Sequence, residues 1–272
     1  MPLALTSAQI EKRYATDGGT LARYLLSPVI AREKEVNQGA KGGEAWAWVP
    51  PPLIGEGSKV QSAWLHDFLL NPYKIRPATV LRMPRFNMSS EEASKLAAYF
   101  SAVDSVEYPY DFNARRQSDY LAREESGYQT GLKSSNDARK TTRLDDAMRI
   151  VTNNNYCVKC HIVGDYEPKG AERAKAPNLA RIYERLRPEY VRRWIANPKQ
   201  ILPYTSMPQN IPYPAGIDKN LYHGDSIQQV DALVDLLMNY DEFAKRRTLV
   251  EPIVQQNQTT TPAAGAAGGG SA

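Results

Sequence analysis

The feature that most constrains this chain is one pentapeptide. The 272 residues include only two cysteines, and both stand in Cys157-Val158-Lys159-Cys160-His161. Cys-x-x-Cys-His is the attachment motif for c-type haem, in which the two thiols add to the haem vinyl groups and the histidine becomes the proximal iron ligand. Because this spacing places both thiols and the imidazole on one turn, the pentapeptide predicts one covalently bound haem c held by Cys157, Cys160 and His161.

Two other uses of a cysteine pair are the alternatives. A redox Cys-x-x-Cys needs no following histidine and normally lies in a βαβ unit, whereas the residues around Cys157 show no strand-period alternation. A zinc site would need a second pair of cysteine or histidine ligands, and the remaining histidines, His66 and His223, are too scattered to complete one. The motif therefore favours haem over a redox disulfide or zinc.

Three amphipathic helices are predicted around the motif. Each has apolar residues at helical spacing: Leu144, Ala147, Met148 and Val151; Tyr190, Val191, Trp194 and Ile195; and Val230, Leu233, Val234 and Leu237. Asn197-Pro198 ends the second helix, and the loop Thr205-Ser206-Met207-Pro208 precedes the third. The order is helix, Cys-x-x-Cys-His, loop, helix, Thr-x-Met-Pro loop and helix.

This order resembles that of the class I c-type cytochromes, and residues 143–243 match it throughout. The resemblance implies that the sulfur of Met207 takes the iron position opposite His161, so that both are metal ligands. A soft, neutral thioether stabilises ferrous iron and raises the reduction potential. The resemblance also implies that Pro177 packs near His161, where a carbonyl accepts the other ring N–H and fixes the tautomer.

The resemblance further implies that Tyr190 and Trp194 bind haem, with their polar tips on a propionate. Packing in the core is the alternative for these aromatic residues and for Met207. His223 is a rival axial ligand, although its place in a surface loop makes this role the less favoured one. His66 falls off the apolar face of its predicted helix, so we expect it to face solvent or a partner.

The first half of the chain repeats the second half. A shift of 126 residues, without a gap, aligns Pro51 with Pro177, Leu53 with Leu179, Val60 with Leu186, Trp64 with Tyr190, Phe68 with Trp194, Asn71-Pro72 with Asn197-Pro198 and Pro77 with Pro203. After a two-residue slip, Met83-Pro84 meets Met207-Pro208, and the apolar stripe of the third helix recurs over residues 93–100.

The haem motif itself is not repeated. At the same offset it meets residues 31–35, and no cysteine or histidine precedes His66. The first half is therefore expected to fold as a degenerate cytochrome c-like domain without haem. We expect Met83 to be packed in its core, with Trp46, Trp48 and Met88 filling the vacated space. The alternative for the two tryptophans is a surface patch for a partner.

The predicted fold class is all-α, with tandem cytochrome c-like domains and long irregular loops. The haem-less domain spans residues 1–104, a charged linker 105–142, the haem domain 143–245 and a disordered tail 246–272.

Composition limits the partners. Hydrophobic residues make up 42% and charged residues 24%, and the formal net charge of +4 suits an acidic protein partner better than nucleic acid. Basic residues crowd the segment 169–199, either to steer redox partners or as an ordinary solvated surface. No stretch approaches the ~20 apolar residues of a transmembrane segment. Charged residues 11–13 stand where the apolar core of a signal would lie, so neither an export signal nor a membrane anchor is expected.

The resemblance implies electron transfer rather than enzymatic catalysis, because an iron with both axial positions filled has no open place for a substrate. We expect a carrier for, or a subunit of, a respiratory or photosynthetic membrane complex, with redox proteins as partners. In this family haem attachment is completed in the periplasm or an equivalent extracytoplasmic space. The alternatives are a mainly structural adaptor subunit of such a complex and a peroxidase-like haem enzyme, in which Met207 would have to dissociate.

Overall fold

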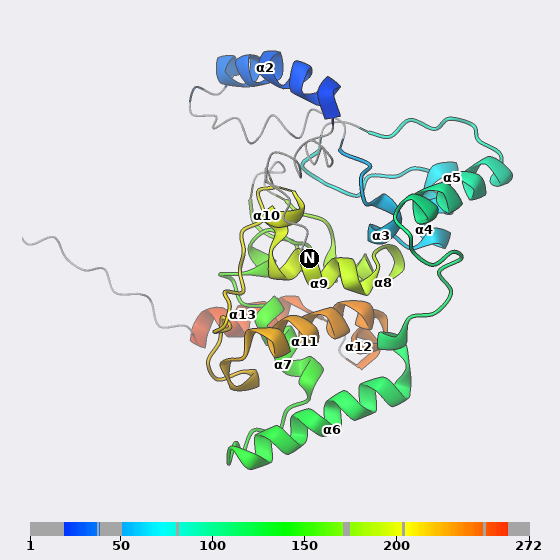
Figure 1. Ribbon diagram of the computed structural model, residues 1–272. Coiled ribbons are helices and arrows are strands. Elements are labelled where there is room, and N and C mark those ends of the chain that lie inside the picture. Colours follow the sequence, from blue (N-terminus) through cyan, green and yellow to red (C-terminus); the bar gives the residue numbers. More distant parts are fainter. Residues whose placement is uncertain are drawn as a thin grey trace, which may run out of the picture.

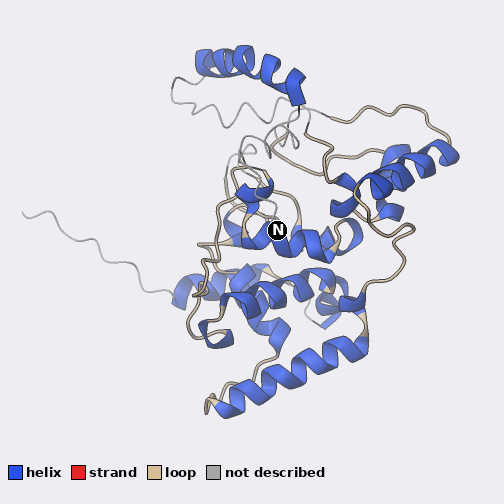
Figure 2. Cartoon of the chain, in the orientation of Figure 1, coloured by secondary structure: helices blue, strands red, loops and turns tan. Residues whose placement is uncertain are grey.

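Every regular element that the structure describes is a helix. The computed structural model describes residues 19–36, 38, 51–79, 82–170, 175–202, 205–246 and 249–260. Within these ranges no strand forms, and only isolated backbone bridges occur (Figure 2). The all-α expectation is therefore confirmed for the described residues. None of their helices is both long and apolar enough to cross a bilayer.

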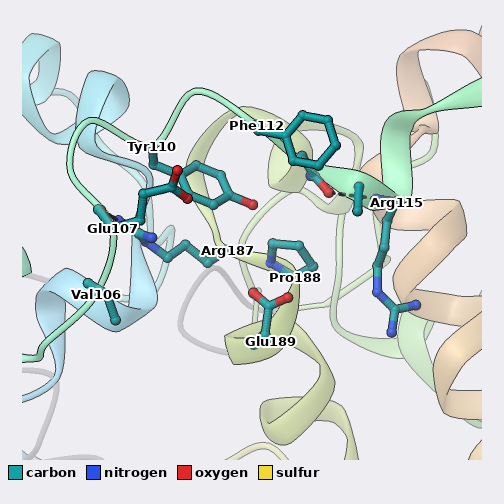
Figure 3. A pocket seen from close by; sticks show the side chains of 10 residues that line it. Val106, Glu107, Tyr110, Phe112, Arg115, Arg187, Pro188 and Glu189 are labelled. Atoms are coloured by element: carbon teal, nitrogen blue, oxygen red, sulfur yellow. Dashed lines mark hydrogen bonds between the residues drawn. The ribbon is translucent and has the colours of Figure 1, made fainter.

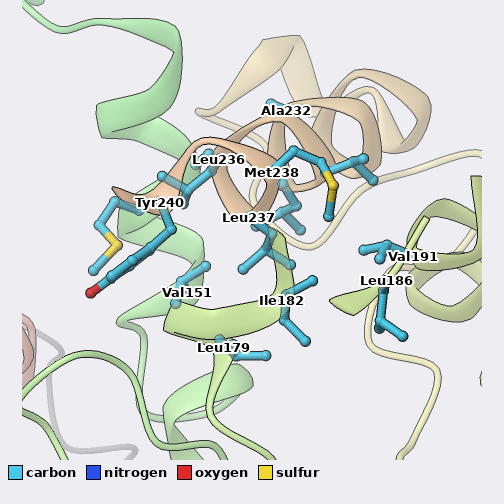
Figure 4. Close-up of a cluster of buried hydrophobic side chains, with 14 of the residues drawn as sticks. Val151, Leu179, Ile182, Leu186, Val191, Ala232, Leu236, Leu237, Met238 and Tyr240 are labelled. Atoms are coloured by element: carbon cyan, nitrogen blue, oxygen red, sulfur yellow. The ribbon is translucent and has the colours of Figure 1, made fainter. Parts of the chain in front are cut away.

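Helix α11 (Ser226–Met238) forms the centre of the second half. Ten of its thirteen residues are buried. It packs against α7 (Arg143–Val151), α8 (Ile182–Arg185) and α9 (Pro188–Ala196) (Figure 1). Figure 4 shows the side chains of α11 meeting Val151 of α7 and the apolar residues that run from Leu179 into α9.

The boundaries of these helices follow local chemistry. Thr142 caps α7 by accepting a hydrogen bond from the backbone N–H of Asp145 at 3.1 Å. Pro188 occupies the first turn of α9, where its missing N–H costs nothing, and Asn197 follows the last residue. Asp225 caps α11 in the same way as Thr142 caps α7. The three helices predicted around the motif are thus present, with the apolar faces that the spacing indicated.

The first half holds three packed helices, α3 (Glu56–Lys59), α4 (Ser62–Leu70) and α5 (Ser90–Val103). Helix α5 begins with a capping box, and it packs against both α3 and α4. The approach of α3 is so close that a Cβ at Gly57 would overlap the carbonyl of Phe100. A further helix, α2 (Gly19–Val36), is set apart from the others (Figure 1).

The helices of the two halves repeat at the spacing seen in the sequence. Helices α3 and α8 have four residues each and start 126 positions apart, and so do α4 and α9, with nine residues each. Val60 and Leu186, which precede the longer helices, form an antiparallel backbone bridge with each other. Helix α3 contacts α9 as α8 contacts α4. Equivalent residues therefore meet each other, and the two halves are related by a local two-fold axis.

The backbone hydrogen bonds at this axis form a symmetric pair. The N–H of Gln61 donates to the carbonyl of Arg185 at 2.8 Å, and the N–H of Arg187 donates to the carbonyl of Lys59 at 2.9 Å. Gln61 is equivalent to Arg187, and Lys59 to Arg185. Each half thus supplies a carbonyl that accepts the backbone N–H just before the other half's helix, so that the halves share one backbone junction.

Side chains at the same two positions strengthen the junction. The Gln61 amide donates to the carbonyl of Leu186 at 2.9 Å, and the Arg187 guanidinium donates to the carbonyl of Val60 at 3.0 Å. Arg187 also donates to the carbonyl of Glu107 at 2.8 Å. The Arg187 side chain is buried, and its bond to the carbonyl of Val60 lies out of water, where a hydrogen bond is strongest.

The segment expected as a charged linker is packed on the second half. Its main element is α6 (Ser118–Ser134), which lies beside α7, and Tyr128 and Leu132 of this helix are buried. Before it, Arg115 and Arg116 pair with carboxylates of α11 and α12 (Tyr240–Arg246). From Arg115 onward the segment therefore packs on the second half, whereas its start bonds to the first half, where the N–H of Tyr110 donates to the Ser62 hydroxyl at 2.8 Å.

The expected disordered tail contains a helix, α13 (Glu251–Thr260), so the prediction of disorder is wrong for this segment. Val250 and Val254 are buried. The Asp165 carboxylate accepts the N–H of Val250 at 2.6 Å and fixes the point at which the helix begins. Two valines one helical turn apart were too short a pattern to reveal this docking. Residues from 261 onward lie outside the described ranges.

The prediction of which methionine and tryptophan side chains fill the core of the first half is also wrong in part. Met83 is 36% exposed, so it does not fill a core position. Met88 is partly buried against the core. Trp46 and Trp48 lie outside the described residues. His66 does not simply face solvent, because its ring nitrogens contact the side chains of Asp67 and Ser90.

Arg187→Met should lower the free energy of unfolding by about 2–3 kcal/mol, because the buried carbonyl of Val60 in the first half and the carbonyl of Glu107 both lose their charged donor. Urea unfolding followed by circular dichroism measures the loss. Arg193→Met, at an exposed position of α9, the helix that Arg187 precedes, is the matched control. Its free energy of unfolding should stay within about 0.5 kcal/mol of that of the parent protein. Equal losses of stability in the two variants would contradict the role of Arg187 at the junction.

Candidate functional site

The Cys-x-x-Cys-His pentapeptide forms one tight turn after α7. Its first three residues make the short helix η3 (Cys157–Lys159). The N–H of Cys160 donates to the carbonyl of Cys157 at 3.2 Å, and the N–H of His161 donates to the same carbonyl at 2.8 Å. The two thiols and the imidazole therefore come from a single turn, as the spacing indicated.

The loop that follows returns to the turn. The N–H of Ala176 donates to the carbonyl of Cys160 at 2.7 Å, and the N–H of Leu179 donates to that of Ile162 at 2.8 Å. These bonds place Pro177 beside the motif.

The His161 ring is oriented by one hydrogen bond. Its Nδ1 lies 2.7 Å from the carbonyl oxygen of Pro177. A carbonyl can only accept, so Nδ1 must carry the proton, and in the neutral ring Nε2 is then an unprotonated nitrogen with a free lone pair. Among the described residues Nε2 has no hydrogen-bond partner. The expected contact between Pro177 and His161 is thus present in the structure, with the tautomer that a metal ligand through Nε2 requires.

Burial keeps the site in its neutral form. Removal from water lowers the pKa of His161, an effect that the bond to Pro177 only partly opposes. The ring is therefore uncharged at neutral pH. Burial likewise raises the pKa of the Cys157 thiol from 9.0 to about 12, so this sulfur is a thiol and not a thiolate in the haem-free chain.

The other predicted site residues form a second group on α9 and the loop after it. The rings of Tyr190 and Trp194 are stacked, with centroids 5.8 Å apart and an interplanar angle of 18°. The indole Nε1 of Trp194 lies 2.9 Å from Sδ of Met207. The indole N–H, which the resemblance assigned to a haem propionate, is therefore directed at the sulfur in this structure.

Within the described chain, no hydrogen bond or ring contact joins the His161–Pro177 group to the Trp194–Met207 group. His223, the rival ligand, is exposed on a loop. The same part of the chain contains no group of three or more histidine, cysteine, aspartate or glutamate residues arranged to hold a metal ion.

The donor atoms fit a covalently bound haem. The thiols are three residues apart on one turn, and the imidazole presents an unpartnered Nε2 with its tautomer fixed by Pro177. Met207 adds a neutral thioether, whose sulfur keeps a second lone pair beside the one that accepts the indole N–H. Cys157, Cys160, His161 and Met207 are the residues that would hold the group.

A surface pocket of about 320 Å³ lies elsewhere, at the junction of the halves (Figure 3). Residues of the segment 106–115 line it together with the start of α9. Beside it, the Arg187 guanidinium lies 4.3 Å from the centre of the Tyr110 ring. The motif residues do not line this pocket, so it is separate from the cysteine–histidine turn.

Internal contacts occupy much of the basic segment 169–199. Several of its cations pair with nearby carboxylates or pack on an aromatic ring, namely Lys175 with Glu167, Arg181 with Glu184, Arg192 with Asp231 and Arg185 over Trp64. This reduces the charge that the segment offers to an acidic partner.

No protein-family model, curated protein or solved structure matches this chain. What the site can do follows from its own donor atoms.

In the haem-free protein, Cys157 should react with iodoacetamide at least about tenfold more slowly when native than when unfolded in urea, because the thiolate is the reactive form. With its pKa raised to about 12, the native rate should keep rising with pH beyond the point at which the unfolded chain levels off. Cys160→Ala leaves Cys157 as the single reporter, and peptide mass spectrometry measures its alkylation. Equal native and unfolded rates would exclude the raised pKa.

Proposed function

We propose that this chain transfers electrons through a single haem c, attached to Cys157 and Cys160, with His161 and Met207 as axial ligands. The observation that carries the proposal is the His161–Pro177 hydrogen bond, which leaves Nε2 bare on the same turn as the two cysteines. Fixing the tautomer of a ligating histidine through its other nitrogen is the usual support for such a ligand.

The chemistry divides between the group and the chain. When bound, haem supplies a one-electron ferric/ferrous couple. The thiols of Cys157 and Cys160 would tether it, and the neutral imidazole of His161 and the neutral thioether of Met207 would hold its iron. With both donors supplied by the chain, no position would be left for a substrate, which favours electron transfer over catalysis.

The proposed architecture is a tandem of cytochrome c-like domains, of which the first, over residues 1–104, lacks haem and the second, over 143–245, carries it. The repeated helix boundaries and the local two-fold axis support the tandem. The first half offers no cysteine, and His66, its single histidine, contacts Asp67 and Ser90. Residues 115–142 and α13 pack with the second half and belong to the proposed electron-transfer unit.

The partners proposed are redox proteins of a respiratory or photosynthetic membrane complex, on its periplasmic or equivalent extracytoplasmic side. The support is the family resemblance, in which covalent haem attachment is completed there. No nucleic-acid partner is proposed.

A mainly structural adaptor role is the second candidate, and one observation favours it. Large apolar side chains are exposed along the first half and the segment after it: Leu53, Ile54, Tyr73, Phe86, Tyr99, Val103, Tyr108 and Phe112. Where such side chains form a contiguous patch, they are typical of a protein interface. Docking through the first half is compatible with electron transfer through the second.

A peroxidase-like activity would require the Met207 sulfur to leave the iron. The indole N–H of Trp194 and the Thr205 hydroxyl, which accepts the N–H of Met207 at 3.3 Å, both hold this residue in place. Slow binding of cyanide to the ferric protein is therefore expected, and rapid binding would favour the enzyme.

Expression in a host that matures c-type cytochromes should yield one covalent haem per chain, and the double variant Cys157→Ala/Cys160→Ala should yield none. Met207→Ala should retain the haem but lose the near-infrared sulfur-to-iron charge-transfer band, because it removes the thioether ligand. Mass spectrometry and absorption spectroscopy measure these outcomes.

Met83→Ala, at the equivalent methionine of the first half, is the matched control and should leave the band unchanged. Absence of covalent haem from the unmutated chain would overturn the proposed function. A band that survives in Met207→Ala would overturn the axial ligand.

A further inference from the structure

The sulfur of Met207 has a single polar side-chain partner among the described residues, the indole of Trp194. The 2.9 Å separation between Nε1 and Sδ is within hydrogen-bonding distance. An indole N–H can only donate, and a thioether sulfur is a weak acceptor. The direction of this bond is therefore unambiguous.

The indole is held by its own helix. Trp194 stacks on Tyr190 one turn earlier, and between them Val191 is buried in the core. The backbone of Met207 is fixed separately, because its N–H donates to the hydroxyl of Thr205 at 3.3 Å. Two contacts from different sides thus define where the thioether lies.

The first half provides an internal comparison. At an offset of 126 residues, Trp64 and Phe68 correspond to Tyr190 and Trp194, and they are stacked in the same manner, with centroids 4.8 Å apart and an interplanar angle of 15°. Phe68, which replaces Trp194, has no N–H. Met83, the counterpart of Met207, is 36% exposed and has no such donor in the described part of the chain.

The comparison separates packing from hydrogen bonding. A phenylalanine is sufficient to build the aromatic stack, since Phe68 does so in the half that lacks the haem motif. The indole N–H occurs at this position only in the half that has the motif. The indole N–H of Trp194 is therefore needed for its bond to the Met207 sulfur and not for the aromatic stack.

We propose that Trp194 is a positioning residue for the axial ligand, whose indole N–H holds the Met207 sulfur in place and withdraws electron density from it. This inference rests on the proposed function, because it concerns the same haem ligand. One lone pair of the sulfur accepts the indole N–H, and the other remains for the iron.

Both effects of the hydrogen bond act on the reduction potential in the same direction. A thioether that accepts a hydrogen bond from an N–H is a weaker donor to ferric iron, which disfavours the ferric form and raises the potential. A sulfur without this bond is freer to leave ferric iron, and its departure would stabilise the ferric form. Removal of the N–H should therefore lower the potential.

Trp194→Phe in the haem-loaded full chain tests the proposal, because it installs the residue that the first half already uses in an equivalent stack. Covalent haem content should be unchanged. The charge-transfer band should weaken, the potential should fall, and cyanide should bind the ferric protein about tenfold faster, the factor expected for the loss of one hydrogen bond.

Trp64→Phe is the matched control. It removes an indole that is also stacked and that also donates a hydrogen bond, to the hydroxyl of Tyr73 at 2.9 Å, but in the half without the motif. The band, the potential and the cyanide rate should all match those of the unmutated protein.

A double variant tests whether Trp194 acts through the sulfur. In a Met207→Ala background, Trp194→Phe should produce no further change in potential, because the acceptor is already absent. A contact between Trp194 and a haem propionate, or a general effect on packing, would lower the potential by the same amount in both backgrounds and would overturn the proposal.

The outcomes of these experiments distinguish a failure of the proposed function from a failure of the role of Trp194. If the unmutated chain takes up no covalent haem, the proposed function fails, and the role of Trp194 fails with it. If haem is bound and the band depends on Met207, but Trp194→Phe leaves band, potential and cyanide rate unchanged, the role of Trp194 alone is overturned.

Discussion

A buried carboxylate on the central helix organises the second half of this protein. Asp235 of α11 has no exposed surface, and it accepts hydrogen bonds from Arg115, Arg143 and the hydroxyl of Tyr120. An unpaired charge in this position would cost several kcal/mol. Docking of α11 in the core therefore requires the segment before α6 and the start of α7 to be in place as well. Since α7 leads directly into the cysteine–histidine turn, the position of the turn depends on this ion cluster.

The sequence was sufficient to predict the helices around the turn, because their apolar residues recur at helical spacing and their ends have local signals, such as Pro188 and Asn197. It was also sufficient for the internal repeat, whose offset the helix boundaries reproduce. The docking of residues 105–142 was not predictable, since charged residues dominate this segment and their partners, such as Asp235, lie more than a hundred positions away. Burial of only Tyr128 and Leu132 leaves too weak a pattern to read.

Only part of the candidate site could be predicted from the sequence, for a similar reason. Cys157, Cys160 and His161 are adjacent in sequence, so their spacing alone determines that they share a turn. The partner of Trp194 depends on how a loop returns to α9, which no local pattern encodes. One signal was available: the repeat aligns Trp194 with Phe68 and Met207 with Met83. The half that has the motif therefore has an N–H donor at a position where the other half has none.

The first half has a structural consequence for the proposed ligand. Helix α9, which holds Trp194, begins immediately after Arg187, and the backbone and side chain of Arg187 both bond to the first half. Gln61 of the first half in turn donates to the carbonyls of Tyr183 and Leu186, at the approach to the same helix. Loss of these contacts would leave buried polar groups unpaired at the start of α9. The first half thus fixes the helix from which Trp194 reaches Met207, and this gives a physical reason for a chain with one Cys-x-x-Cys-His motif to have two repeats.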